Sequence, residues 1–471
     1  MLAVLLQTQT SLFDRSLSLI GVFVCLGLAY LMSVNRSKIN WKIVMWGVAL
    51  QFIFGLIVLH PTMQQFFFDG VSSAVGTLLS FSEEAAHFVF GTMTPHNISV
   101  VDPATGEVGE QFFIGKISPP SNSIAFVIII PTIIFFSSLM SILYQLGIMQ
   151  KVVSVLALVM QKTMGTTGPE SLSAAANIFV GQTEAPLVIK PYISKMSSSE
   201  IHAVMTGGFA TVAGGVMAAY VGFLQNAIPS IAGHLVAASI MSAPAALALS
   251  KVVWPMHAKE EDTQPITSEE KKEHTEKELS DNIEDAAIKE TSTEDSRPYG
   301  NIVEAAAIGA SEGMKLALNV LGMLIAFVGL IALVNWGLSL IPIGDDPLTL
   351  QKILGWAFAP LAFTMGIPWS ECQIVGSLLG EKIAMTEFVA YLHLAEILNS
   401  PEPLLSERSA IITSYALCGF ANFASIGIQI GGIGGIAPER VSELSQMGIR
   451  AMLAGTLAAC MTGTIAGVLV G

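Results

Sequence analysis

Charged side chains are scarce in this chain. Asp, Glu, Lys and Arg make up 12% of its 471 residues, about half of the share found in soluble globular domains. Only four cysteines occur, and their spacing is not that of a metal site. We therefore expect neither a disulfide framework nor a zinc centre around Cys25, Cys372, Cys418 and Cys460.

Long apolar runs dominate what is present. Hydrophobic residues make up 52% of the chain, and its mean hydropathy is +0.64. Six runs approach the ~20 residues that a helix needs to cross a bilayer; they lie at 17–34, 43–59, 124–146, 231–249, 316–338 and 451–470. The first lacks a small-residue cleavage site, so we interpret it as a retained helix and not as a signal peptide. This pattern predicts a polytopic membrane protein.

The distribution of basic residues predicts the orientation in the membrane. Between residues 43 and 150 the only lysine or arginine is Lys116, whereas basic residues follow the first and third apolar runs. Because cytoplasmic loops carry the excess of Lys and Arg, the first loop and the region after Gln150 are expected to face the cytoplasm. The N-terminus, the C-terminus and residues 60–121 are then expected to face outward, and the membrane is taken to be a bacterial inner membrane.

Much of the negative charge is local. Residues 257–300 hold 14 acids and 6 bases, with almost no apolar periodicity. This composition is typical of solvated, disordered segments, so we expect a cytoplasmic loop between two membrane bundles.

An internal repeat relates the two bundles. Met-Gln-Lys-Val at 149–152 matches Leu-Gln-Lys-Ile at 350–353, and Gly-Phe-Ala at 208–210 matches Gly-Phe-Ala at 419–421. By our count three crossings lie between the copies, and an odd number turns the second copy upside down relative to the first. Inverted repeats are typical of secondary transporters, whose sites lie near the bilayer midplane where interrupted helices meet.

Each copy contains an acid between apolar arms that are too short to cross a bilayer. Glu184 lies between arms at 171–180 and 187–193, and Glu387 follows Thr386 in the second copy. A central acid in a membrane helix costs roughly 2.5–3.5 kcal/mol on insertion scales, so an acid that is kept there indicates a function. Two short arms with a polar tip predict a re-entrant hairpin that protein or a water-filled cavity covers.

A Gly-Phe-Ala segment follows each hairpin and predicts an interrupted helix. Thr211 and the pair Gly214-Gly215 follow the first segment, and Asn422 and Ser425 follow the second. Small residues let a membrane helix unwind and offer its carbonyls or amides to a ligand. Two tips and two interrupted helices are thus expected to converge, with both acids pointing into one pocket.

The resulting fold class is an all-α integral membrane protein with about eight transmembrane helices, two re-entrant helical hairpins, an inverted repeat and interfacial helices. Its segments are N-terminal scaffold helices with an outward-facing segment at 1–121, a first repeat at 122–256, the acidic loop at 257–300 and a second repeat at 301–471. Glu170 and Glu371 begin the two hairpins, where we interpret them as helix N-terminal charges that the helix dipole stabilises.

Three segments resemble the concentrative nucleoside transporter family. They are Asn-Ile-Phe-Val-Gly-Gln-Thr-Glu-Ala-Pro-Leu at 177–187, Gly-Glu-Lys-Ile-Ala-Met-Thr-Glu-Phe-Val-Ala-Tyr at 380–391 and Cys-Gly-Phe-Ala-Asn-Phe-Ala-Ser-Ile-Gly-Ile at 418–428. The resemblance runs from about Gln150 to the C-terminus without the acidic loop. It implies sodium-driven nucleoside import by alternating access in a homotrimer, with sodium as the coupling ion, no organic cofactor and no nucleic-acid partner.

The resemblance also implies roles for matching residues. Gln182 and Thr183 would hydrogen-bond the nucleobase, with Glu184 beside them and Val216 as a packing wall. A carboxylate accepts strong, charge-assisted bonds from sugar hydroxyls, and the ribose would bind Glu387, Asn422 and Ser425.

Sodium would bind an oxygen-only set that suits a hard cation, formed by Asn177, the carbonyls of Val180 and Val212, and the Thr211 side chain. The family signature has Asn where this chain has Thr386, which leaves the preference between pyrimidine and purine nucleosides open.

Three alternatives stay open at this point. Proton coupling would follow if a buried Glu184 took up a proton in place of sodium, although Asn177 and Thr211 favour sodium. A passive channel would show polar residues along several full spans, whereas here they cluster at one depth. An intramembrane enzyme would need a nucleophile–base pair or metal ligands near Glu184, and neither His nor Cys occurs in the first tip or at 205–224.

Overall fold

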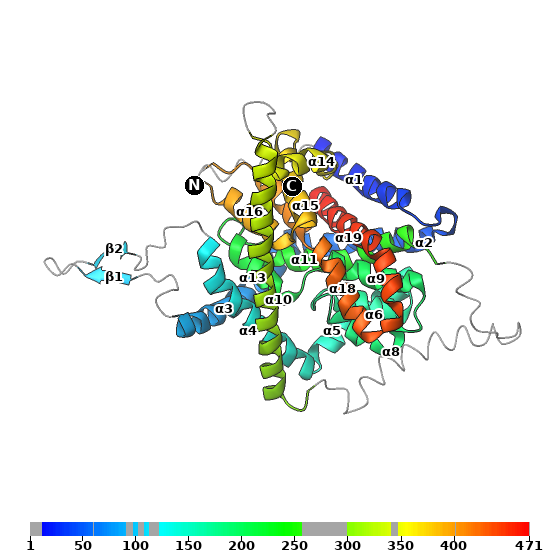
Figure 1. Ribbon diagram of the computed structural model, residues 1–471, viewed down its shortest axis with the longest axis horizontal. Helices are drawn as coiled ribbons and strands as arrows, with labels where there is room; N and C mark the ends of the chain where they lie inside the picture. Colours follow the sequence, from blue (N-terminus) through cyan, green and yellow to red (C-terminus); the bar gives the residue numbers. More distant parts are fainter. Residues whose placement is uncertain are drawn as a thin grey trace, which may run out of the picture.

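The structure is a computed structural model of the chain. It describes residues 12–59, 61–90, 98–101, 108–112, 122–256, 299–340, 347–400 and 402–470. Within these ranges the chain is almost entirely helical, with one antiparallel pair of strands, β1 (Ile98–Val101) and β2 (Val108–Phe112) (Figure 1). The predicted fold class is therefore confirmed, and the strand pair is an addition that the sequence did not indicate.

Three N-terminal helices precede the repeats, α1 (Leu12–Leu31), α2 (Trp41–Leu59) and α3 (Pro61–Phe90), with the short 3-10 helix η1 (Arg36–Lys38) between the first two. The first two match predicted spans. The third occupies part of the segment that was expected only as an outward-facing stretch, and it packs on α4 (Asn122–Gln145) and α11 (Ile231–Val253). Hydropathy missed α3 because Asp69, Glu83 and Glu84 interrupt its apolar residues.

Two series of elements follow in the same order. Each has a long helix, a second helix that precedes the hairpin, the hairpin itself, an interrupted helix and a final long helix. The first series is α4, α5 (Ile148–Met164), α6 (Gly168–Ala176), α7 (Ala185–Val188), α8 (Lys190–Ile193), α9 (Ser198–Ala210), α10 (Gly214–Leu224) and α11. The second is α13 (Ile302–Ser339), α14 (Leu350–Thr364), α15 (Trp369–Ala384), α16 (Glu387–Leu398), α17 (Glu407–Leu417), α18 (Phe423–Ile436), η4 (Pro438–Arg440) and α19 (Val441–Leu469).

The turn into each hairpin requires a glycine. Gly165 has φ 73° and Gly366 has φ 88°, a left-handed conformation that other residues rarely adopt. These two glycines occupy equivalent places in the repeat, one before α6 and one before α15. The backbone thus supports the duplication that the sequence matches indicate.

The hairpin arms are short, as expected. At ~1.5 Å of rise per residue, the nine residues of α6 and the twelve of α16 each fall well short of the ~30 Å hydrocarbon core. Six described helices are long and apolar enough to cross a membrane, or up to eight if each of two sharply bent helix pairs counts as one span. That range includes the predicted number.

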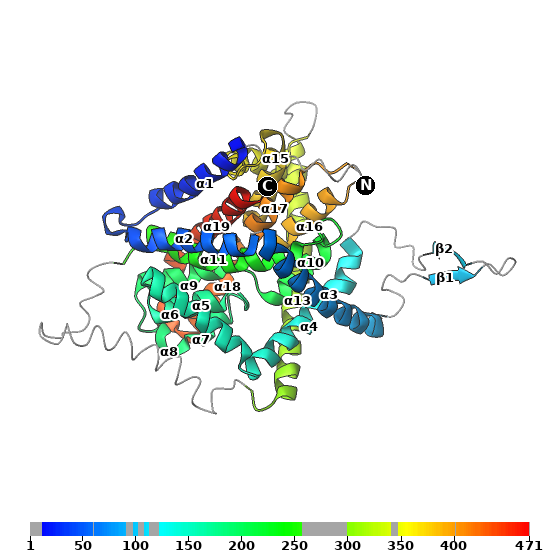
Figure 2. The same ribbon diagram turned by 180° about the vertical axis from the view of Figure 1, so that it is seen from behind.

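The last helices of the two series form the centre of the molecule. α11 packs against α2, α9 and α19, and α19 packs against α1, α9 and α17 (Figures 1 and 2). Nearly all of α11 is buried, and small side chains such as Ala237 and Ala238 permit close approach. α13 differs, because it crosses the front of the molecule in the view of Figure 1, with α4 as its main neighbour and most of its apolar side chains exposed.

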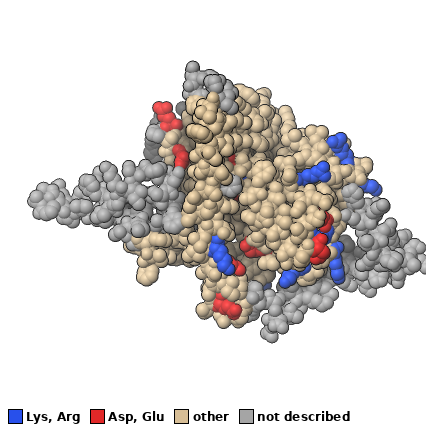
Figure 3. All heavy atoms as spheres, in the orientation of Figure 1, with Lys and Arg blue, Asp and Glu red and all other residues tan. Residues whose placement is uncertain are grey.

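The surface agrees with a membrane setting. The face drawn in Figure 3 carries few charged side chains. Exposed apolar residues of α13 include Ile325, Val328, Leu333 and Trp336. The predicted acidic loop at 257–300 lies almost wholly outside the described residues, and the predicted domain boundaries remain predictions.

Candidate functional site

The second hairpin tip holds a buried carboxylate. α15 ends at Ala384 and α16 begins at Glu387, with Thr386 as the N-cap whose hydroxyl accepts from the Val389 N–H. Glu387 is 3% exposed. Its Oε1 accepts from the Tyr220 hydroxyl at 2.9 Å, and its Oε2 accepts from Asn422 Nδ2 at 3.0 Å. The Thr that departs from the family signature therefore caps the helix that presents this acid.

The two interrupted helices meet at their breaks. The Phe420 N–H, in the break between α17 and α18, donates to the Thr211 carbonyl, in the break between α9 and α10, at 3.3 Å. Gly419 has φ 152°, and an added Cβ there would lie 2.7 Å from the Phe209 carbonyl oxygen. A residue without a side chain is therefore needed for this approach.

The first hairpin tip lies against the same breaks. The Gly214 N–H, at the start of α10, donates to the Phe179 carbonyl in the tip at 2.9 Å. Gln182 is 8% exposed, and its Nε2 donates to Ser425 Oγ in α18 at 2.9 Å. Both tips and both breaks thus converge, as the sequence predicts.

Glu184 differs from the expectation. It is exposed, its Oε1 accepts from the Thr183 hydroxyl at 2.9 Å, and its Oε2 occupies the space that a side chain at Gly181 would fill. The carboxylate thus lies over this glycine, and Glu184 is the N-cap of α7, which has Pro186 in its first turn. Of the two predicted inward-pointing acids, only Glu387 is enclosed.

A continuous chain of hydrogen bonds joins the two repeats. Beyond the Glu387 bonds from Tyr220 and Asn422, the Ser425 N–H donates to Asn422 Oδ1 at 2.9 Å. The Gln182–Ser425 bond continues the chain, and Gln429 Nε2 ends it by donating to Gln182 Oε1 at 3.0 Å. Every donor in this chain points toward the Glu387 end, which suits an ionised carboxylate as the final acceptor.

Two residues of this hydrogen-bond chain, Tyr220 and Gln429, were not predicted from the sequence. Tyr220 lies one helical turn after Val216 in α10, and Gln429 lies one turn after Ser425 in α18. Residues four apart share one face of a helix. Extending the helix faces that carry Val216 and Ser425 by one turn would therefore have predicted both residues. Val216 itself is 2% exposed and belongs to the apolar core.

The predicted sodium ligands include a buried amide without partners. Asn177, at the end of α6, is 1% exposed, and neither its Oδ1 nor its Nδ2 has a hydrogen-bond partner among the described residues. Thr211 is 2% exposed and donates to the Gly207 carbonyl at 2.9 Å. Within the described ranges, the carbonyls of Val180 and Val212 accept no backbone hydrogen bond outside the helices. A buried amide oxygen, a hydroxyl and two free carbonyls fit the donor chemistry of a hard cation.

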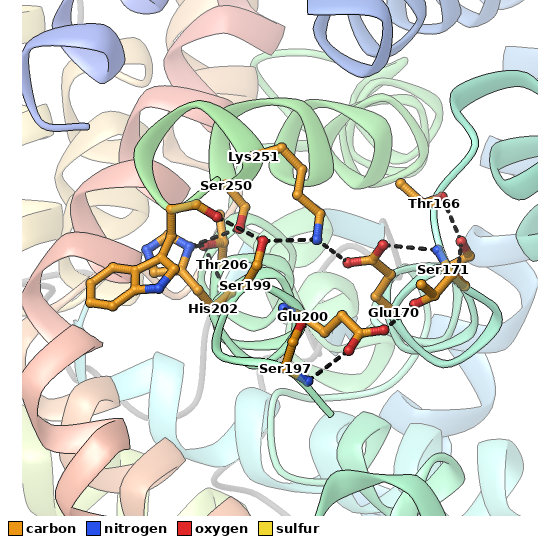
Figure 4. Close-up of polar contacts among 12 residues, drawn as sticks. Thr166, Glu170, Ser171, Ser197, Ser199, Glu200, His202, Thr206, Ser250 and Lys251 are labelled. Atoms are coloured by element: carbon orange, nitrogen blue, oxygen red, sulfur yellow. Dashed lines mark hydrogen bonds and ion pairs between the residues drawn. The ribbon is translucent and has the colours of Figure 1, made fainter. Parts of the chain in front are cut away.

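A second polar cluster, which we call the hairpin base, holds α6, α9 and α11 together (Figure 4). Lys251 Nζ lies 2.6 Å from Glu170 Oε2 and donates to Ser199 Oγ at 3.1 Å. Glu170 Oε1 also accepts from the Thr167 N–H at 2.9 Å, which makes it part of a capping box. The predicted helix N-terminal position of Glu170 agrees with this geometry, and the buried ion pair is additional.

The hairpin base also contains a histidine. α9 begins at Ser198, so it includes His202, which lies outside the 205–224 range that the sequence assigned to this helix. His202 Nδ1 and Ser250 Oγ are 2.7 Å apart, and the ring stacks on Trp254. This histidine therefore packs within the hairpin base, and no described contact joins it to Glu184.

Comparison with known proteins gives three matching family models. They are "Na+ dependent nucleoside transporter N-terminus" at 20–93, "Nucleoside recognition" at 126–227 and "Na+ dependent nucleoside transporter C-terminus" at 234–467.

Curated relatives cover nearly the whole chain. It is similar to an uncharacterized transporter of Haemophilus influenzae, at 42% identity over 96% of this chain and 97% of that protein. Nucleoside permease NupC of Helicobacter pylori is 37% identical over 98% of this chain and 99% of that protein. Sodium/nucleoside cotransporter 1 of Mus musculus is 37% identical over 97% of this chain, which spans only 64% of that longer protein.

Solved structures of one transporter, CNTnw, share the fold. Its inward-facing substrate-bound state matches with a TM-score of 0.80 and 36% identity, covering 97% of this chain and 98% of that one. A variant of CNTnw in an outward-facing state matches with a TM-score of 0.80 and 35% identity, over the same shares of the two chains.

The hairpin base generates a prediction about stability. Lys251→Met leaves Glu170 buried without its counter-charge, so we expect the free energy of unfolding to fall by about 3–5 kcal/mol. Replacing both partners, with Lys251→Met and Glu170→Gln together, is expected to recover most of this loss. Thermal unfolding of the purified protein in detergent measures both, with the exposed Lys195→Met as the matched control. An unchanged melting temperature for Lys251→Met would contradict the role given to the ion pair.

Proposed function

The chain belongs to the family of concentrative, sodium-dependent nucleoside transporters, and on this basis we propose that it imports nucleosides by symport with sodium through alternating access. The observation that carries the proposal is Glu387, a buried carboxylate where two hairpin tips and two interrupted helices meet. Such a meeting point is where inverted-repeat transporters hold substrate and coupling ions.

The hydrogen-bond chain supports a division of labour for the nucleoside. An ionised carboxylate offers about four acceptor positions, and Tyr220 and Asn422 occupy two of those on Glu387. The remaining positions accept from ribose hydroxyls, with Asn422 and Ser425 beside them. Gln182 and Thr183 would bond the nucleobase edge, and Val216 would pack on its face. Glu184 would contact the base from the rim of the tip.

Sodium is proposed to bind Asn177, Thr211 and the carbonyls of Val180 and Val212. The support is the unpartnered Asn177 amide and the bond between Gly214 and Phe179 that holds the tip against the break. Bound sodium would order the tip, and Gln182 follows Val180 by only two residues. If sodium tightens nucleoside binding in this way, nucleoside must tighten sodium binding by the same factor.

Proton coupling is the alternative for the ion. This alternative requires a buried Glu184 that takes up a proton, whereas the Glu184 side chain is exposed. The oxygen set around Asn177 therefore supports sodium better.

The assembly and membrane placement are proposed from the family and the surface together. The exposed apolar side of α13 suits contact with lipid or with other copies, and a homotrimer would bury part of it. We place the protein in a bacterial inner membrane with both termini outward, from the distribution of basic residues. The division into a scaffold at 1–121 and repeats at 122–256 and 301–471 belongs to the same proposal.

The function itself is tested by uptake into sealed proteoliposomes. An inward sodium gradient is expected to drive accumulation of radiolabelled uridine or adenosine above the external concentration, and choline in place of sodium is expected to abolish it. Recovery of unmodified nucleoside separates a carrier from an enzyme, and simple equilibration would indicate a channel. Accumulation driven by a proton gradient without sodium would favour the alternative.

The proposed sodium set predicts a change in ion dependence. Asn177→Ala removes one oxygen ligand, so the sodium concentration for half-maximal uptake is expected to rise roughly tenfold or more, as for the loss of a contact to a charged group. The exposed Asn226→Ala serves as the matched control and should leave this concentration unchanged. An unaltered sodium dependence in Asn177→Ala would remove Asn177 from the site.

The Tyr220 hydroxyl predicts a change in sugar selectivity. Tyr220→Phe removes one donor that orients Glu387, so kcat/KM for ribonucleosides is expected to fall about 3- to 10-fold, the equivalent of one hydrogen bond. The ratio of uridine uptake to 2′,3′-dideoxyuridine uptake should also fall in this variant. Tyr415→Phe is the matched control, because that buried hydroxyl contacts His234 and not Glu387. An equal ratio in both variants would exclude a part for Tyr220 in sugar recognition.

A further inference from the structure

Gln429 hydrogen-bonds the Gln182 amide from the opposite repeat. Gln429 is 1% exposed, and its Nε2 lies 3.0 Å from Gln182 Oε1 and 3.1 Å from the Met205 carbonyl oxygen in α9. An amide nitrogen carries two N–H groups. Both donors of Gln429 are therefore used, one on a side chain of the other repeat and one on backbone.

The backbone contact decides the orientation. A carbonyl oxygen only accepts, so a Gln429 amide turned the other way would place its own Oε1 against the Met205 carbonyl and against Gln182 Oε1. Buried polar groups that face each other without a proton are strongly disfavoured. Gln182 must then accept through Oε1, which leaves its Nε2 as the donor on the opposite side, where it bonds Ser425 Oγ.

Both amides pack closely against the backbone of α9 at Gly208. An added Cβ at Gly208 would lie 2.8 Å from Gln429 Nε2 and 3.0 Å from Gln182 Cβ. On α18, Ser425, Gln429 and Gly432 share the face that receives the first tip, since Gly432 approaches Thr183. The face of α18 and the missing side chain at Gly208 together hold the two amides side by side.

We propose that Gln429 is a positioning residue that sets nucleobase selectivity, by keeping the Gln182 N–H groups directed toward the substrate. The inference rests on the proposed contact between Gln182 and the nucleobase. One N–H of Gln182 Nε2 has no partner among the described residues and is available to the base. A donor in that place selects a base edge with a carbonyl over one with an amino group, because two facing donors leave both unpaired.

Matched nucleoside pairs test this directly. Uridine has a carbonyl at position 4 and an N–H at position 3, where cytidine has an amino group and a bare nitrogen. Inosine and adenosine differ in the same way at positions 6 and 1, so the carbonyl and amino groups of each pair mark the position that the Gln182 donor would face. The wild-type protein is expected to have the larger kcat/KM for the carbonyl member of each transported pair. Gln429→Met frees the Gln182 amide to turn, so this ratio should fall roughly 3- to 10-fold, the equivalent of one hydrogen bond.

Gln429→Glu is expected to reverse the preference. In its protonated form, the new hydroxyl oxygen takes the place of Nε2, donates its single O–H to the Met205 carbonyl and accepts from Gln182 Nε2 through a lone pair. The Gln182 amide then turns, presents its oxygen to the substrate and selects the amino member of the pair. If this variant does not reach the membrane, Gly208→Ala takes its place, because the added methyl group crowds Gln429 Nε2. Gly208→Ala should lower the ratio of kcat/KM for the carbonyl member to that for the amino member.

Gln51→Met is the matched control. Gln51 is equally buried in α2, where its Nε2 donates to the Gly47 carbonyl of the same helix. Its replacement should leave the ratio as in the wild type, and sodium dependence should stay the same in all variants. An unchanged ratio in Gln429 variants that still transport would overturn the inference alone, whereas absence of sodium-driven uptake by the wild type would overturn the proposed function beneath it.

Discussion

Backbone that unwinds at membrane depth has no water to bond, so its polar groups need partners within the protein. In each break, one backbone N–H is bonded by a segment that is distant in sequence. The Phe420 N–H uses the Thr211 carbonyl in the other break, and the Gly214 N–H uses the Phe179 carbonyl in the first tip. These bonds hold the two breaks and the first tip against one another. The positions of Gln182, Glu387, Asn422 and Ser425 follow from this mutual bonding.

The acid at the start of each hairpin, Glu170 or Glu371, also has its partners within the protein. The two repeats supply these partners with different residues. In the first repeat, Glu170 pairs with Lys251 of α11. In the second, Glu371 accepts from Ser406, and the cation is Arg408 of α17, which donates to the carbonyls of Gly366 and Gly467. In both copies, these contacts thus join the hairpin to the interrupted helix that follows it and to the final helix. The basic residue lies on the last helix in the first copy and on the interrupted helix in the second.

Much of this architecture could be predicted from the sequence, because hydropathy and repeat matches report on properties of single segments. The hairpins, the interrupted helices and the acid at Glu387 belong to that part. The helix α3 could not, since its acids break the apolar pattern, and the exposure of Glu184 depends on how its side chain folds over Gly181. Tyr220 and Gln429 lie one turn beyond predicted residues, yet their partners come from the opposite repeat. No pattern along the chain specifies such pairs until the tips are placed.

In the proposed mechanism, coupling between ion and nucleoside would depend on what differs between an ordered and a disordered first tip. An ion that binds both forms equally shifts nothing, however tightly it binds. The proposed sodium set draws on the tip through Asn177 and Val180 and on the break through Thr211 and Val212, so it would be complete only when the tip is docked. Docking also brings Gln182 within reach of Gln429, whose orientation the Met205 carbonyl maintains. The ion would thus determine when the Gln182 amide is in place, and the opposite repeat would determine which way that amide faces.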